Sequence, residues 1–213
     1  MTSRIFVVNT RAANLHSVSK ALEKVGAAIE ITSDPSDLES AAGVVLPGVG
    51  ASDAVMRAIN TQGFAEPLKK YAGSGRPLLC ICVGMQVLMD GSDEGEIPGL
   101  GLISGRVRRF PADISENGKR LKVPHMGWNS VHLAQPAMDN PVFAGIPQDS
   151  YFYFVHSYRC QPEDSTVIAA TARYGEEVCA AVAFDEVVGT QFHPEKSGDL
   201  GLEMYQNFVR RVG

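Results

Sequence analysis

Three residues of the sequence could together carry out nucleophilic catalysis on an acyl group, and the first of them is Cys82. It follows the apolar run PLLCI and precedes Val83, Gly84 and the helix-like MQVLM, a pattern that predicts a nucleophile on a sharp turn between a strand and a helix. Backbone N–H groups at the start of such a helix would stabilise negative charge on the sulfur. Gly84 would keep the crowded turn free of a side chain. Alternatively, Cys82 is a small buried hydrophobic residue, as free cysteines often are, and we assign that role to Cys80.

The motif QFHPE near the end of the chain supplies a base for such a cysteine. His193 and Glu195 are two residues apart, and in extended chain residues i and i+2 point to the same side. Glu195 could therefore hold the imidazole in one orientation and balance its charge, as the third member of a triad does. We interpret the other histidines as structural: His16, His125, His132 and His156.

The loop PGVG at 47–50 could complete an oxyanion hole. Two glycines flank Val49, so its peptide unit can adopt more than one orientation. One orientation would point the Val49 N–H at a developing oxyanion beside the N–H of Val83, where such donors contribute roughly 3–4 kcal/mol each. The alternative is a plain strand-to-helix turn.

The elements that must position these residues alternate between strands and helices through residue 90. We expect strands at 4–8, 28–32, 43–46 and 77–81, and helices around 15–25, 52–59, 64–71 and 85–89. This alternation predicts a parallel sheet with helices on both faces. In such sheets the functional site lies at the carboxyl ends of the strands, where both Cys82 and His193 are expected.

After Gly99 the segments become short, β-branched or aromatic, and punctuated by turn residues. They predict antiparallel strands near 101–109, 120–124, 129–133, 151–155, 166–172 and 178–184. A strand at 187–191 and a helix at 200–209 follow. The predicted fold class is α/β: a single three-layer domain over 1–213, with a mixed, mostly parallel central sheet flanked by helices and antiparallel additions in the C-terminal half.

The composition excludes several classes of protein. A chain of 213 residues with 45% hydrophobic residues and a net charge of −5 suits one globular domain and argues against general nucleic-acid binding. No apolar stretch approaches the roughly 20 residues of a membrane helix, and the N-terminus lacks signal-peptide features. Four unevenly placed cysteines predict a reduced, cytoplasmic protein. Metal-ligand spacing and a phosphate-binding loop are both lacking, so we expect no metal and no cofactor. One basic cluster is interpreted as a solvated hairpin face: Arg106, Arg108, Arg109, Lys119, Arg120 and Lys122.

Taken together, PLLCICVGMQ, FHPEKSG and PGVG resemble a class I glutamine amidotransferase domain over nearly the whole chain. Three further segments are similar to the glutaminase subunits of imidazole glycerol phosphate synthases, from histidine biosynthesis: NLHSV (14–18), KVPHMGWN (122–129) and YFYFVHSYR (151–159). The resemblance implies hydrolysis of L-glutamine through a Cys82 thioester. The ammonia would pass to a (β/α)8-barrel cyclase partner, which makes imidazole glycerol phosphate and aminoimidazole carboxamide ribonucleotide.

The resemblance also implies a role for each matching residue. His193 and Glu195 would complete the triad, and the backbone of Val49 and Val83 would form the oxyanion hole. The implied substrate-binding residues are Gly50, Gln86, Glu94, Ser157 and Tyr158, with Glu94 binding the substrate ammonium, and the implied partner-facing residues are Asn14, Trp128 and Tyr153. The chain departs from the family at Cys80, where glycine is usual.

Other functions remain open from the sequence. A glutaminase serving another synthase, such as those for anthranilate or pyridoxal phosphate, shares the cysteine and HPE elements. An elbow cysteine on an α/β sheet also occurs in peptidase-like or deglycase-like hydrolases, although these lack His-Pro-Glu near the C-terminus. A scaffold that has lost activity is the alternative outside the enzymes.

Overall fold

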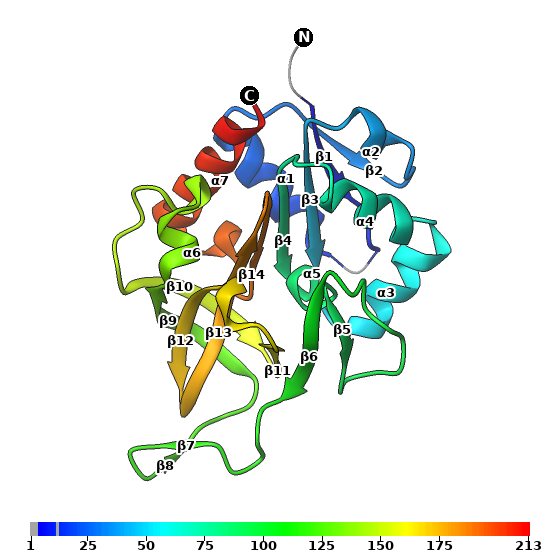
Figure 1. Ribbon diagram of the computed structural model, residues 1–213. Coiled ribbons are helices and arrows are strands. Elements are labelled where there is room, and N and C mark those ends of the chain that lie inside the picture. Colours follow the sequence, from blue (N-terminus) through cyan, green and yellow to red (C-terminus); the bar gives the residue numbers. More distant parts are fainter. Residues whose placement is uncertain (1–3, 12) are drawn as a thin grey trace.

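A nine-stranded sheet forms the centre of the computed structural model, which describes residues 4–11 and 13–213 (Figure 1). The strand order is β10-β9-β12-β13-β14-β4-β3-β1-β2. The parallel part contains β1 (Ile5–Val8), β2 (Ile29–Thr32), β3 (Gly43–Gly48), β4 (Leu78–Cys82) and β14 (Val187–Thr190). The antiparallel part contains β9 (His125–Leu133), β10 (Ser150–His156), β12 (Ile168–Tyr174) and β13 (Glu176–Phe184). The predicted α/β class, with a mixed sheet and antiparallel additions, is confirmed.

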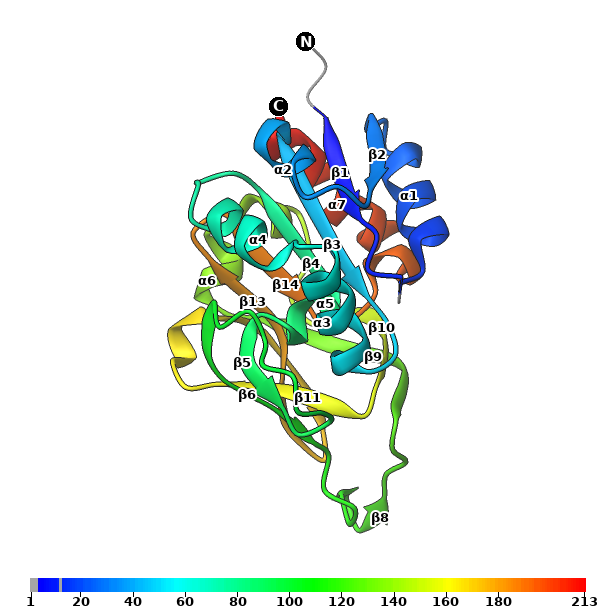
Figure 2. The same ribbon diagram turned by 90° about the vertical axis from the view of Figure 1, so that its right-hand side faces the viewer.

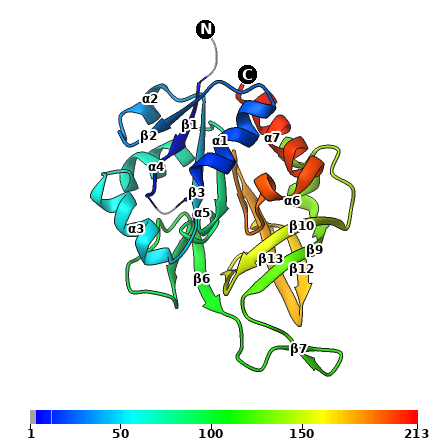
Figure 3. The same ribbon diagram turned by 180° about the vertical axis from the view of Figure 1, so that it is seen from behind.

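Helices cover both faces of the parallel part. In the view from behind, α1 (Leu15–Lys24) and α7 (Gly198–Val212) lie in front of the sheet (Figure 3), and α3 (Ser52–Thr61) and α4 (Ala65–Ala72) lie on the opposite face. α1 buries Val18 and Leu22, the apolar face expected from a spacing of four residues, and Gly26 follows the helix with φ +87°. None of the helices in 4–11 and 13–213 is long and apolar enough to cross a bilayer.

Several short elements complete the chain. The helical turns are α2 (Asp37–Ser40), α6 (Gln135–Met138), η1 (Pro141–Phe143), η2 (Ser165–Val167) and η3 (Pro194–Lys196). A hairpin of β7 (Ser115–Glu116) and β8 (Lys119–Arg120) extends away from the body (Figure 2). The basic cluster is exposed, as predicted: it lies on this hairpin, just after it at Lys122, and on strand β6 (Ile103–Arg109). Two of its members, Arg106 and Arg108, form ion pairs with Asp93.

A second sheet contains a strand that the sequence did not predict. Its order is β11-β6-β5, with β5 (Met89–Ser92), β6 (Ile103–Arg109) and β11 (Tyr158–Pro162). β6 pairs antiparallel with β11 but parallel with β5. Because β11 follows β10 after a single residue, the aromatic segment 151–159 turns from the large sheet into the small one at Ser157.

The predicted helix at 85–89 is wrong. The helix after Cys82 is the single turn α5 (Val83–Gln86), and Met89 begins strand β5. The N–H groups of Leu102 and Ile103 both donate to the Leu88 carbonyl, so tertiary pairing replaces helix continuation. A short run that is buried on all sides does not reveal helix or strand by periodicity.

The predicted strand at 120–124 is also wrong, because only Arg120 of this segment lies in a strand and β9 begins at His125. Pro124 has no N–H to contribute to a ladder, which disfavours a strand through this position.

Candidate active site

Cys82 occupies the strained turn that its sequence context predicts. It is the last residue of β4 and immediately precedes α5. Its backbone has φ +56° and ψ −108°, a region that residues with a side chain rarely adopt. Such strain is retained where the surrounding structure imposes it, commonly at functional sites.

Two glycines allow the elbow to pack directly against β3. A Cβ on Gly84 would lie 2.0 Å from the carbonyl oxygen of Leu46, and one on Gly48 would lie 2.8 Å from the Gly84 nitrogen. Both distances are too short for any side chain, so only glycine fits at either position. This contact brings the end of β3, and with it Val49, beside Val83.

His193 and Glu195 form the second half of the site. His193 lies beyond β14, where η3 begins, and its Nδ1 is 2.7 Å from Oε1 of Glu195. The two side chains are 2% and 1% exposed, so solvent scarcely screens this pair. The second carboxylate oxygen accepts a hydrogen bond of 3.4 Å from the Tyr205 hydroxyl, and burial raises the pKa of Tyr205, which keeps it a neutral donor.

The environment of His193 favours its protonated form. Burial opposes the charge, but Cys82 and Glu195, through hydrogen bonding and charge, outweigh this effect and raise the pKa of His193 to about 10. Apart from this interaction with Cys82, the buried Nε2 atom of His193 has no hydrogen-bond partner among the described residues. This nitrogen is therefore free to exchange a proton with a group in the cavity.

A cavity of about 490 Å³ joins these groups. Its lining residues are Asn14, Val49, Gly50, Cys82, Val83, Gln86, Glu94, Pro124, Val155, His156, Ser157, Tyr158, His193 and Lys196. The structure thus brings together every site residue expected from the sequence except Glu195, Trp128 and Tyr153. Glu195 is not part of the lining and instead binds Nδ1 of His193. Across 4–11 and 13–213, no group of three His, Cys, Asp or Glu side chains is arranged to hold a metal ion.

The side chain of Gln86 connects two walls of the cavity. Its Nε2 donates to the carbonyl of Tyr158 at 3.1 Å and to Oε1 of Gln191 at 3.0 Å. Gln191 in turn places its amide nitrogen 3.7 Å from the Cys82 sulfur. The sequence reasoning missed Gln191 and Tyr205. Gln191 could have been found from its position two residues before His193, whereas nothing marks Tyr205 except its place on the final helix.

Glu94 also lines the cavity, and its carboxylate could both cap a helix and bind a ligand. One carboxylate oxygen accepts a 2.8 Å hydrogen bond from the N–H of Ser52, the first residue of α3. A carboxylate at a helix start satisfies an otherwise unpaired donor. Its second oxygen can still bind a ligand cation.

Trp128 and Tyr153 lie outside the cavity on adjacent strands. They are paired across β9 and β10, with ring centroids 6.2 Å apart at 77°. Trp128 is 55% exposed. The ammonium of Lys196, a cavity residue, lies 5.8 Å from the Tyr153 ring centroid, so the aromatic pair adjoins the site. Asn14, at the cavity rim, caps α1 by accepting from Ser17.

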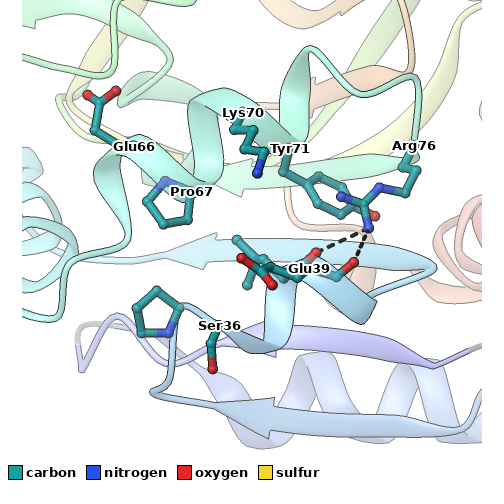
Figure 4. A pocket seen from close by; sticks show the side chains of 9 residues that line it. Ser36, Glu39, Glu66, Pro67, Lys70, Tyr71 and Arg76 are labelled. Carbon is teal, nitrogen blue, oxygen red and sulfur yellow. Dashed lines mark hydrogen bonds between the residues drawn. The ribbon is translucent and has the colours of Figure 1, made fainter.

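A second cavity, of about 610 Å³, lies between α2 and α4 (Figure 4). One of its cationic residues, Arg76, donates to the backbone carbonyls of Leu38, Glu39 and Ala41. The described lining contains neither cysteine nor histidine, and we assign it no catalytic role.

Comparison with known proteins agrees with this geometry. The family model for glutamine amidotransferase class-I matches residues 6–212. The chain is similar to the imidazole glycerol phosphate synthase subunit HisH of Synechococcus sp. (strain JA-3-3Ab), with 45% identity over 98% of this chain and 94% of the relative. It is 48% identical to the same subunit of Syntrophotalea carbinolica, over 96% of this chain and 98% of the relative.

Solved structures agree on the fold. PurLQS from Thermotoga maritima superposes with a TM-score of 0.75 at 19% identity, covering 100% of both chains. The glutaminase domain of Trypanosoma brucei CTPS superposes with a TM-score of 0.66 at 16% identity, covering 99% of this chain and 94% of that one. The chain belongs to the class I glutamine amidotransferases and, among them, to the family of the imidazole glycerol phosphate synthase subunit HisH.

Proposed function

We propose that this chain, acting as one amidotransferase domain over 1–213, is the glutaminase subunit of an imidazole glycerol phosphate synthase. It hydrolyses L-glutamine to L-glutamate and ammonia, and a cyclase partner uses the ammonia. The observation that carries this proposal is the single cavity lined by Cys82 and His193, with the Glu195 carboxylate fixed behind the imidazole.

The reaction begins with attack of the Cys82 thiolate on the side-chain amide carbon of glutamine. The oxyanion of the tetrahedral intermediate accepts hydrogen bonds from the N–H groups of Val49 and Val83, which follow or lie within segments that pack against each other through Gly48 and Gly84. Protonated His193 delivers its proton to the departing nitrogen, and ammonia leaves. A water molecule, deprotonated by the now neutral imidazole, then attacks the thioester and releases glutamate with the thiol restored.

The substrate's polar groups have partners elsewhere in the same cavity. Glu94 faces it with one uncommitted oxygen, which suits the α-ammonium of glutamine. Gly50 and the backbone at Ser157 and Tyr158 also line the cavity and suit the α-carboxylate and the amide of glutamine. Gln86 supports this wall through its bond to Tyr158.

The cyclase, which we expect to be a (β/α)8-barrel, docks on the aromatic face beside the cavity. This face consists of Met126, Trp128, Tyr151 and Tyr153 on β9 and β10; the first three are 61%, 55% and 61% exposed. Exposed aromatic and methionine side chains grouped on one face are typical of protein interfaces. Asn14 and Lys196 line the cavity, and the Lys196 ammonium also lies near the Tyr153 ring, so we expect ammonia to leave on this side.

The Val49 peptide offers a means of control by the partner. Gly48 and Gly50 flank it, and Gly50 has φ +82°, so the peptide can turn its N–H toward or away from the oxyanion. We expect the isolated subunit to be nearly inactive until the cyclase binds its own ligand. Equal rates of glutamine hydrolysis by the isolated chain and by the ligand-loaded complex would exclude this control.

Two observations support our proposals for the partner synthase and for the cellular compartment. Relatives of 45–48% identity that carry the HisH name favour the imidazole glycerol phosphate cyclase over anthranilate or pyridoxal phosphate synthases. All four cysteines are free thiols, which suits a reducing compartment, and we place the protein in the cytoplasm.

The substitution Cys82→Ala tests the proposal. In the complex with the cyclase, glutamine-dependent synthesis should disappear while synthesis from ammonium salts continues, because the alanine removes only the nucleophile. Cys80→Ala, which alters a fully buried thiol on the same strand, is the control and should retain both activities. A Cys82→Ala protein that hydrolyses glutamine at the wild-type rate would refute the assignment.

A further inference from the structure

We propose that His125 and His156 are positioning residues for glutamine: a one-directional chain of hydrogen bonds through both rings holds the Tyr158 carbonyl, and so the substrate wall, in place. This inference rests on the proposed glutaminase function. Neither ring belongs to the triad.

The chain of hydrogen bonds runs from the outer strand to the cavity. The Asn129 amide nitrogen lies 3.2 Å from Nε2 of His125, and Nδ1 of His125 lies 2.9 Å from Nε2 of His156. Nδ1 of His156 lies 2.8 Å from the carbonyl oxygen of Tyr158. His125 and His156 are 3% and 5% exposed, so the rings lie almost wholly out of solvent.

The backbone at each end fixes the direction of every hydrogen bond. The Ser130 N–H can only donate, and it donates to Oδ1 of Asn129, while the Arg173 carbonyl can only accept and binds the Asn129 amide nitrogen. Asn129 must therefore present its N–H₂ group to His125. At the other end the Tyr158 carbonyl can only accept, so His156 must carry its proton on Nδ1.

The two ends agree only if both rings are neutral and both carry the proton on Nδ1. An additional proton on Nε2 of His156 would face the Nδ1–H of His125, and one on Nε2 of His125 would face the N–H₂ group of Asn129. Consistent with this, burial lowers the pKa of His125 to about 4 and that of His156 to about 3. The series of hydrogen bonds ends at the Asn129 amide, which does not release protons. The series is therefore suited to holding groups in position and not to conducting protons.

Aromatic packing prevents the rings from turning to another arrangement. His125 is stacked between Tyr174, at a centroid distance of 4.0 Å, and Phe154, at 4.8 Å. Phe110 lies 5.2 Å from the ring of His156. Rotation of either ring would have to displace these side chains, so core packing fixes the direction of the hydrogen bonds.

In the site, the hydrogen bond from His156 helps to fix the carbonyl of Tyr158, whose two acceptor positions are both occupied. The Tyr158 oxygen accepts from His156 and from Nε2 of Gln86 at 3.1 Å. Gln86 also binds Gln191, whose amide approaches the Cys82 sulfur. Losing His156 as a donor would leave the Tyr158 carbonyl held by Gln86 alone, and the wall that binds glutamine would be less firmly positioned.

The test compares four variants in the complex with the cyclase and its ligand. His156→Leu and His125→Leu should raise the KM for glutamine about tenfold, the effect of one lost buried hydrogen bond, with kcat changed by less than about threefold. His156→Asn places an amide N–H where Nδ1 was and should restore KM to within about threefold of wild type. His132→Asn, at an exposed histidine, is the control and should behave as wild type.

The outcomes separate this inference from the proposed function. An unchanged KM in His156→Leu, or no rescue by His156→Asn, overturns the positioning role, while the Cys82→Ala result decides the glutaminase assignment independently. Should the leucine variants fail to fold, nitrogen-15 NMR spectra of the wild-type protein still test the inference, because they report the tautomer and charge of each histidine. Both His125 and His156 should show the Nδ1-protonated neutral tautomer, and finding either ring in the Nε2-protonated or charged form would overturn the inference.

Discussion

Replacing Gly84 by alanine tests how the elbow is built. The new Cβ would lie 2.0 Å from the Leu46 carbonyl oxygen, so β3 would have to withdraw by about 1 Å to restore an acceptable contact. The neighbour is backbone inside a parallel ladder and cannot rotate away. Overpacking of this kind costs about 1–3 kcal/mol, and we expect the upper part of that range here.

The substitution should act on both stability and catalysis. About 3 kcal/mol corresponds to a fall in melting temperature of about 6–12 °C for a chain of this size. Withdrawal of β3 also separates Val49 from Val83, and loss of one oxyanion donor lowers kcat by about 10²–10³. Thermal unfolding and the glutaminase rate of the complex measure the two effects.

Gly73→Ala provides the matched control. Gly73 has φ −81°, and the nearest atom to an added Cβ is the Lys69 carbonyl oxygen at 3.8 Å, so this alanine should change neither property appreciably. If Gly84→Ala melts at the wild-type temperature and retains full activity, the close packing of the elbow against β3 is not what positions the oxyanion hole.

Three other predictions follow from the site and its surroundings. Glu195→Gln should lower kcat by about 10³–10⁴ with little change in KM, as loss of the orienting carboxylate does in related triads; a loss below tenfold would contradict its role. Trp128→Ala should weaken binding to the cyclase at least about tenfold, whereas Met138→Ala, equally exposed on α6, should not, and titration calorimetry measures both. The pKa values of His125 and His156, about 4 and 3 in the folded protein against 6.5 in the unfolded chain, mean that the unfolded chain binds more protons below about pH 6.5. The free energy of unfolding should therefore fall by about 3 kcal/mol between about pH 6.5 and 5, and a constant urea midpoint would contradict this.

The local arrangement of the proposed catalytic groups could be predicted from the sequence because it depends on short-range geometry. The strand-to-helix turn at Cys82 and the requirement for Gly84 follow from neighbours along the chain. The same holds for His193 and Glu195, which share a side because they are two residues apart, and their separation of 2.7 Å agrees with that reasoning.

Tertiary structure alone decided the features that depend on pairing between distant segments. Whether residues 87–92 continue a helix or form β5 is settled by hydrogen bonds from residues 99–103, which local propensity does not encode. The placement of Tyr205 behind Glu195, and the chain that joins Asn129 to Tyr158, bring together groups from different strands and helices. Buried polar groups are satisfied by whatever partners folding places beside them, so the sequence by itself indicated the residues that we propose as catalytic, and the fold decided what holds them in place.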